Sequence, residues 1–180
     1  MKNGAEVTLS HGAITKSGAT TDVLGSKFHG QNAAVLAADG ALSMDGCTIR
    51  TEADGANAVF ATGAKGSVKL HDSNIRTTGA SSRVVWNRHR RGQDHRGQHQ
   101  HRHRRDPFRR PGHGTSGASV TVSKSTINTS GEGSPLIYSK GSIKVSEAKG
   151  TAGASEIAVV EGNNAIHLEY VDLSGNGTHG

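Results

Sequence analysis

The chain has 180 residues, including 25 Gly and 3 Pro; only 3% are aromatic and 32% hydrophobic, and the formal net charge is +6. This apolar fraction is low for a compact globular protein, no apolar run is long enough to cross a bilayer, and no basic-then-apolar leader follows Met1. The composition suits a solenoid, which needs only thin internal stacks of apolar side chains.

The first predicted unit covers residues 4–39, where Val7, Leu9 and Ile14 are followed by an apolar run from Ala33 to Ala37. Val7-Thr8-Leu9 already has the pattern of a strand and nothing polar caps it, and residues 174–180 end without a closing element. We therefore expect the chain to be a fragment of a longer protein. An uncapped coil exposes an edge that can pair, so self-association through coil ends or lateral faces is a further expectation.

A repeat with a 26-residue interval follows. Its Ile recurs at Ile49, Ile75 and Ile127, which are 26 and 52 residues apart, so one occurrence is missing. The columns that keep the same spacing are Leu42, Val68 and Val120; Thr51, Thr77 and Thr129; and Phe60, Trp86 and Tyr138. A fixed interval of this length is typical of stacked repeats that bury their apolar faces only against their neighbours.

Each repeat contains three short runs in which apolar and polar residues alternate, separated by Gly, Ser, Asp and Asn turns. Alternation with period two indicates strands. The sequence therefore predicts an all-β fold, a right-handed parallel β-helix solenoid with three strands per coil and about 26 residues per coil. The Ile column is expected inside it, Cys47 is expected as a small buried residue in a Ser column with Ser73 and Ser125, and the Thr column is a candidate hydroxyl ladder near a corner.

Residues 87–113 break the pattern, because they are dominated by Arg, His, Gln and Gly. They hold nine of the 21 Lys and Arg residues, against only Asp94 and Asp106, so the basic charge of the chain is local. The segment stands where the 26-residue register requires a repeat. Its cations cannot be buried in a coil, so we expect it to loop out with high mobility and to interrupt the stack.

Three interpretations of this segment stay open. A nucleic-acid or polyanion arm would use its Arg residues to neutralise phosphates. A metal tract would use the alternating His99, His101 and His103. In the third interpretation the segment is a shifted-frame translation of an ordinary repeat; reversing the shift permits Ile at 94 and 101, in register with Val68 and Ile75, and the coding DNA would test this.

The unit at residues 141–162 is shorter, with Gly150 in the Ile column, and residues 165–173 form a final coil, giving about seven coils in all. The third strands, at residues 57–62, 83–86 and 134–139, contain the best candidate binding surface, the aromatic residues Phe60, Trp86 and Tyr138. We place these on one face with Ala58, Val84 and Leu136. An exposed aromatic ladder would stack sugars or dock a neighbouring chain, whereas a covering loop or a merely β-favouring apolar strand would make it structural.

The units Gly66 to Gly79 and Gly117 to Gly131 resemble the coils of bacterial surface proteins with a pectin-lyase-like right-handed parallel β-helix, of the adhesin or autotransporter-passenger type. The resemblance covers about three quarters of the chain and implies secretion or display at the cell surface. The fold also carries lyases and hydrolases, which use clustered acids. Here Asp45 has His71 one coil away, Asp54 faces Ala80 and Asp72 faces Gln98, so no carboxylate column forms.

From these observations we expect a structural or adhesive segment that binds host or glycan surfaces through outward residues, namely Lys69, Asn74, Arg76, Lys124 and Asn128. A fragment of a polysaccharide-degrading enzyme is the alternative, and a basic nucleic-acid or polyanion binder ranks third. No catalytic residue, cofactor or metal site is nominated, and no membrane span is expected.

Overall fold

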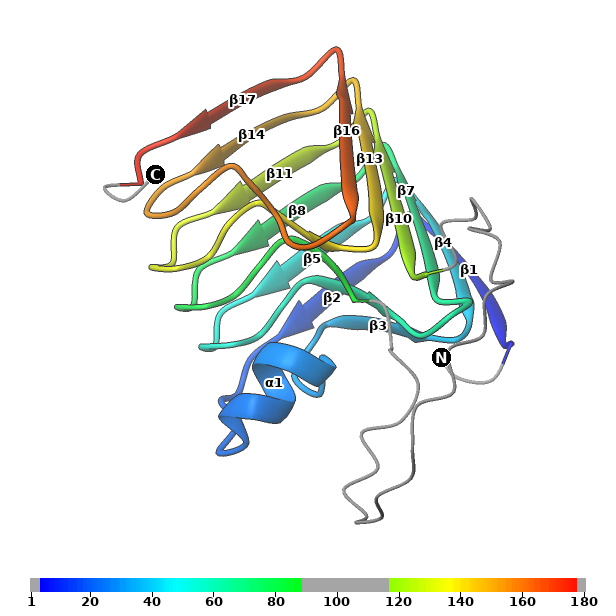
Figure 1. Ribbon diagram of the computed structural model, residues 1–180, viewed down its shortest axis with the longest axis horizontal. Coiled ribbons are helices and arrows are strands. Elements are labelled where there is room, and N and C mark those ends of the chain that lie inside the picture. Colours follow the sequence, from blue (N-terminus) through cyan, green and yellow to red (C-terminus); the bar gives the residue numbers. More distant parts are fainter. Residues whose placement is uncertain (1–3, 89–116, 178–180) are drawn as a thin grey trace, which may run out of the picture.

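The computed structural model describes residues 4–88 and 117–177. It is a parallel β-helix in which the chain turns repeatedly around one axis and builds three sheets, all paired in parallel (Figure 1). The first sheet has six strands in the order β1-β4-β7-β10-β13-β16, the second has six in the order β17-β14-β11-β8-β5-β2, and the third has five in the order β15-β12-β9-β6-β3. The described residues thus form six coils, the last with two strands.

The strand boundaries follow this three-sided plan. The first sheet contains β1 (Glu6–Ser10), β4 (Ala41–Asp45), β7 (Ser67–His71), β10 (Ser119–Ser123), β13 (Ser142–Ser146) and β16 (Ala165–Glu169). The second contains β2 (Ala13–Lys16), β5 (Thr48–Thr51), β8 (Asn74–Thr77), β11 (Thr126–Thr129), β14 (Lys149–Ala152) and β17 (Asp172–Gly175). The third contains β3 (Val35–Ala38), β6 (Val59–Thr62), β9 (Val85–Arg88), β12 (Ile137–Lys140) and β15 (Ala158–Val160).

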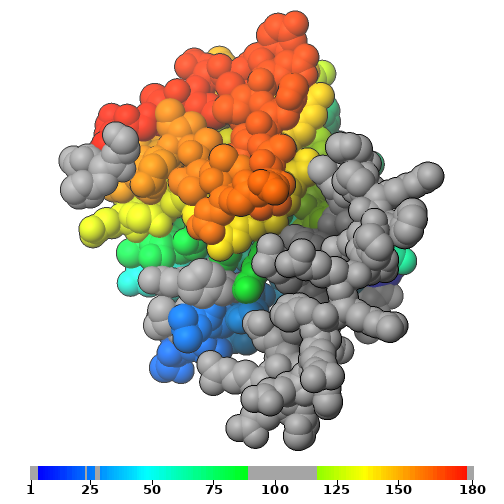
Figure 2. Space-filling view, in the orientation of Figure 1, coloured from blue at the N-terminus to red at the C-terminus, as the bar shows by residue number. Residues whose placement is uncertain are grey.

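The predicted Ile column is present in the interior. Ile49 pairs with Ile75, and Ile75 pairs with Ile127. All three are fully buried, and burying one Ile side chain contributes about 1.5–3 kcal/mol. The shorter fifth coil also agrees with the sequence, since Gly150 takes the position next to Ile127. These columns confirm the parallel β-helix, and Figure 2 shows the coils as successive bands from blue to red.

The coil before residues 89–116 stacks directly on the coil after them, and here two expectations are wrong. Val68 pairs directly with Val120 and Ile75 with Ile127, so no coil lies between the third and the fourth. The strands flanking the segment are fully paired, and the expected interruption of the stack does not occur. The described residues accordingly form six coils, not the expected seven. Residues 87 and 88, assigned to the interruption, belong to β9.

The geometry shows why the stack closes there. Arg88 pairs with both Thr62 and Lys140, and Ser119 pairs with both Ser67 and Ser142. Residues 89–118 therefore connect the same two positions of the coil that residues 63–66 connect in the preceding coil. In the following coil, Gly141 alone makes this connection. The shifted-frame positions 94 and 101, the expected mobility and the His tract lie outside the described residues.

Asn87 holds the two ends of this connection together. It is fully buried, and its Nδ2 donates to the carbonyl oxygens of Ala118 at 2.9 Å and Ser142 at 2.8 Å. Its Oδ1 accepts from the backbone N–H of Lys140 at 3.0 Å and from Ser139 Oγ at 3.2 Å. One side chain thus ties β9 to the residue before β10 and to the coil above, satisfying backbone groups at the edge of the stack.

The corner between the first and second sheets is built from residues in the left-handed region. The residue after the first strand of each coil has a positive φ, between 45° and 59°, although only one of the six is glycine; they are His11, Gly46, Asp72, Lys124, Glu147 and Tyr170. The predicted small column follows, with Cys47, Ser73 and Ser125 buried. Ser73 Oγ accepts from the Cys47 N–H at 3.2 Å, and Ser125 Oγ accepts from the Ser73 N–H at 3.1 Å, so hydroxyls link neighbouring coils.

The Thr column does not form the expected hydroxyl ladder. Thr51, Thr77 and Thr129 are buried and in register, but only Thr77 donates a hydrogen bond, to the carbonyl of Ser82 at 2.8 Å. In the described part of the chain the Oγ1 atoms of Thr51 and Thr129 have no partner. The inward position suits the methyl group, and the hydroxyls do not reach one another along the stack.

The first coil contains a helix that the sequence analysis did not predict, α1 (Val23–His29), inserted between β2 and β3 (Figure 1). Asp22 caps its N-terminus by accepting from the Gly25 N–H at 2.7 Å, and Gly30 ends it with φ 67°. Ser26 Oγ donates to the Gly55 carbonyl at 2.6 Å, which fastens the helix to the second coil. This insertion explains why the first unit is longer than the others.

Candidate binding surface on the third sheet

The predicted aromatic residues lie in one column on the outer face of the third sheet. Phe60 pairs in register with Trp86, and Trp86 with Tyr138. The residues just before them, Val59, Val85 and Ile137, belong to the interior core. The sequence predicted Ala58, Val84 and Leu136 on the face of the aromatic residues, and this is wrong, because all three belong to the interior core. They precede the strands, at a corner where strict alternation does not hold.

The three rings pack edge to face. The centroids of Phe60 and Trp86 are 4.4 Å apart with an interplanar angle of 85°, and those of Trp86 and Tyr138 are 5.7 Å apart at 76°. Edge-to-face pairs of this kind contribute about 0.5–1.5 kcal/mol beyond the area they bury. The aromatic column, meaning Phe60, Trp86 and Tyr138, is therefore a packed cluster outside the solenoid interior.

Burial divides the aromatic column into a covered and an accessible part. Phe60 and Trp86 have no exposed surface, whereas Tyr138 is half-buried. A Cβ built on Gly30, just after α1, would lie 2.7 Å from the Phe60 ring, so the chain after the helix packs directly on that ring. Of the two interpretations of the ladder, burial favours the structural one for Phe60 and Trp86. Only Tyr138 offers a partly open ring.

Cationic side chains border this accessible ring. The guanidinium carbon of Arg83 lies 4.5 Å from the Trp86 centroid and 4.8 Å from that of Tyr138. Lys140 Nζ lies 5.9 Å from the Tyr138 centroid, and Arg88 pairs with Lys140 in the neighbouring coil. Each cation over a ring contributes on the order of 0.5–2 kcal/mol. Arg83, Arg88, Lys140 and Tyr138 together are called the cationic patch below.

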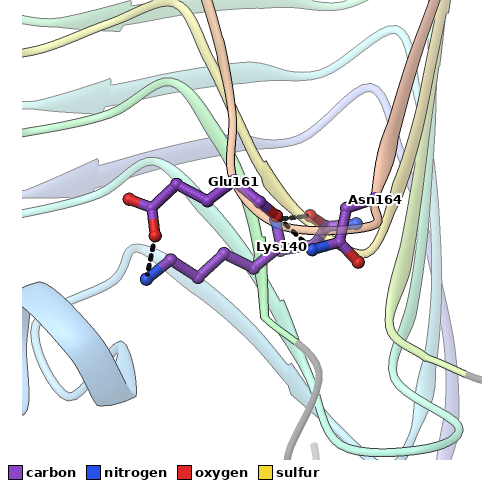
Figure 3. A network of polar contacts seen from close by, with 4 residues as sticks. Lys140, Glu161 and Asn164 are labelled. Carbon is purple, nitrogen blue, oxygen red and sulfur yellow. Dashed lines mark hydrogen bonds and ion pairs between the residues drawn. The ribbon is translucent and has the colours of Figure 1, made fainter.

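One carboxylate faces the cationic patch. Glu161 follows β15 and lies 2.6 Å from Lys140 Nζ, and Figure 3 shows the two side chains extending alongside each other from neighbouring coils. Asn164 Nδ2 donates to the backbone carbonyl of Glu161, which fixes the loop carrying it. Among the described residues that face it, the patch therefore carries three formal positive charges against this single negative one.

Two cationic side chains at the centre of the patch have lowered pKa values. Burial, followed by the charges of Arg88 and Arg83, lowers the pKa of Lys140 even though Glu161 is adjacent. Burial also lowers the pKa of Arg83, an effect that the charge of Glu161 partly opposes. Burial thus disfavours the charged forms of both side chains, and an additional anion beside them would favour those charged forms.

The sequence pattern predicted the aromatic residues of this surface but not its charged residues. Arg83 replaces the Asn57 of the preceding repeat, so no 26-residue column marks it. Glu161 lies in a shorter coil, where the interval is 23 residues between Val120 and Ile143 on the first sheet and 21 between Ile137 and Ala158 on the third. The 26-residue rule therefore places a different residue beside Lys140. A signal was present in Arg88 and Lys140, which are 52 residues apart like the aromatic residues before them.

The other predicted outward residues lie on the first two sheets and at their corner. Lys69, Asn74, Arg76 and Lys124 are exposed, while Asn128 is half-buried and accepts from the Thr151 N–H at 3.1 Å. Arg76 and Asn128 are register partners on the second sheet, with Asn74 on the same strand as Arg76. Lys69 lies on the first sheet and Lys124 at the corner, so the five side chains do not converge on one site.

The acidic residues also lie where the register put them. Asp45 pairs with His71, and Asp54 Oδ1 accepts from the Ala80 N–H at 2.8 Å, a turn-stabilising role; Gln98 lies outside the described residues. Within residues 4–88 and 117–177, no three His, Cys, Asp or Glu side chains gather in a way that would hold a metal ion.

In that same part of the chain, no helix has the length and apolarity that a membrane crossing requires. Comparison with known proteins returned no matching family model, no matching curated protein and no matching solved structure. Function is therefore inferred from the residues of this chain and their geometry.

Proposed function

We propose that this chain is a structural or adhesive segment of a surface-displayed protein, which binds a glycan or another cell-surface partner through its outer faces. The observation that supports this most is the unbroken stack. Six coils share one apolar interior, and each outward position repeats along the axis at the strand spacing of about 4.8 Å. Such a rod holds its surface side chains at fixed spacing without needing a deep pocket.

The polysaccharide-enzyme alternative gains no support from the described geometry. Asp45 has the imidazole of His71 as its in-register neighbour, not a second carboxylate, and Asp54 is engaged with backbone. Paired acids at catalytic spacing are what glycoside hydrolysis requires. The nucleic-acid alternative rests on residues 89–113, which lie outside the described residues.

Binding of the purified chain to a glycan array and to whole cells tests the proposal. We expect saturable binding to at least one glycan class or cell surface, and loss of that binding when the chain is unfolded by urea. Absence of binding to every glycan and every cell type tested would contradict an adhesive role. Depolymerisation of polygalacturonate by the chain would instead support the enzyme.

A further inference from the structure

Arg83, in the cationic patch, has hydrogen-bonding capacity that its contacts with the described residues do not use. Arg83 Nε is buried with no hydrogen-bond partner, and Arg83 Nη1 reaches only the Ser81 carbonyl, at 3.5 Å. A guanidinium carries five N–H donors and pairs well with carboxylate, sulfate or phosphate oxygens. The edge-to-face rings of Trp86 and Tyr138 hold this guanidinium in place, so its Nη donors are oriented before any ligand arrives.

The charges are arranged along the rod. Arg88 and Lys140 are register partners in neighbouring coils, about 4.8 Å apart along the axis. Glu161, the one carboxylate at the patch among the described residues, is already paired with Lys140, and it lies at one end of this row. A linear polyanion lying along the axis would meet two cations in succession, with Arg83 beside them.

Tyr138 adds a feature that a simple anion site does not need. The residue is half-buried, so part of it is accessible, and its ring lies next to Lys140 and Arg83. An aromatic ring with one accessible portion suits packing against the apolar C–H face of a sugar, while nearby cations pair with its acidic substituents. The combination favours an acidic sugar over an isolated inorganic anion.

We propose that the outer face of the third sheet is a binding site for a carboxylated or sulfated glycan, in which Arg83, Arg88 and Lys140 contact the anionic groups and Tyr138 packs against a sugar ring. This inference rests on the proposed adhesive function and specifies its ligand class. Glu161 competes with the ligand for Lys140 and so limits the affinity.

The chain offers a matched control. Lys144, on the outer face of the first sheet, is 3.3 Å from Glu169, much as Lys140 is paired with Glu161. Binding of the full chain to immobilised polygalacturonate, heparin and neutral dextran is compared by biolayer interferometry for Lys140→Gln, Lys144→Gln, Arg83→Gln and Glu161→Gln. Residues 89–116 are unchanged in every variant, so differences between the variants arise from the substituted residues.

We expect Lys140→Gln and Arg83→Gln each to weaken binding to one acidic glycan at least tenfold, as loss of a charge-assisted hydrogen bond implies. Lys144→Gln should change it less than twofold, and Glu161→Gln should strengthen it several-fold. The polygalacturonate and heparin arms separate a carboxylate ligand from a sulfate ligand. If Arg83→Gln fails to fold, as judged by circular dichroism, Lys140→Gln and Glu161→Gln carry the test.

Several outcomes would overturn the proposal. Equal losses in Lys140→Gln and Lys144→Gln would show general electrostatic attraction, and unchanged binding in both would place the ligand elsewhere. Binding to neutral glycans or cells without binding to acidic glycans would leave the adhesive function standing and remove this site. Binding of a homopolymeric RNA, but of no glycan, with the same dependence on Lys140 would indicate a nucleic-acid ligand instead.

Discussion

Removing residues 91–116 while replacing His89 with glycine should leave the β-helix intact and make it more stable. The variant joins β9 to β10 through positions 89, 90, 117 and 118, the same number of residues as the connection 63–66 in the coil below. Glycine is placed at 89 because its counterpart there, Gly63, has φ 90°. Position 118 matches Gly66, since Ser119 pairs with Ser67.

The magnitude follows from the length of the tethered connection. Closing 30 residues, 89–118, instead of four changes the closure entropy by (3/2)RT ln(30/4), which is about 2 kcal/mol in favour of the shorter chain. For a domain of this size, that stabilisation raises Tm by about 4–8 °C. Urea and thermal unfolding followed by circular dichroism measure both quantities.

A partial deletion provides the control. Removing only residues 91–103 leaves a connection of 17 residues, which should give about 0.5 kcal/mol by the same relation. Graded stabilisation across the two deletions would support a stack that closes without this segment. A loss of strand signal or a lower unfolding midpoint in the longer deletion would refute the reasoning, because residues 91–116 would then be contributing contacts that the stack needs.

Three further predictions concern single residues. Ile75→Ala should lower the free energy of unfolding by about 2–5 kcal/mol in urea titrations, because the side chain is fully buried between two other Ile residues and leaves a cavity; a loss below 1 kcal/mol would contradict a packed column. Lys124→Gly should raise the free energy of unfolding by about 0.5–1 kcal/mol, because the strain of φ 49° in a non-glycine residue exceeds the entropy that glycine loses on folding. Lys144→Gly, in the middle of β13, should lower it by a similar amount. A change of the same sign in both variants would be inconsistent with strain at the corner. Asn87→Ala should destabilise by about 2–4 kcal/mol through the backbone groups it leaves unpaired, and an unchanged urea midpoint would show that the connection is held by other contacts.

The interior was predictable from the sequence because period and burial coincide there. Stacked coils place residues one repeat apart in contact, so Ile49, Ile75 and Ile127 mark the core column directly. The αL corner was not evident, because five of its six positions carry residues other than glycine. The helix α1 was missed although Asp22 and Gly30 are suitable caps, since seven residues give too short a run for periodicity to be recognised.

Periodicity could not predict whether the Arg/His segment forms a coil of the stack. A 26-residue register is kept equally well by a coil in that place and by the omission of a whole coil, because both return the next residue to the same column. Val68 therefore aligns with Val120 under either arrangement. Only the energetics decide, and the cost of burying so many cations favours omission.

The candidate surface depends on that omission. If a coil lay between the third and fourth coils, Trp86 and Tyr138 would be separated by two strand spacings, about 9.6 Å, instead of the 5.7 Å between their ring centroids. Arg83 could not then lie 4.5 Å from one centroid and 4.8 Å from the other, because these two distances together fall short of that separation, and Arg88 would lose Lys140 as its register partner. The direct pairing of the third coil with the fourth is thus what brings the rings and cations of two sequence-distant repeats into one patch. It follows that the deletion of residues 91–116 should preserve this patch, whereas inserting a well-formed repeat in their place should dismantle it.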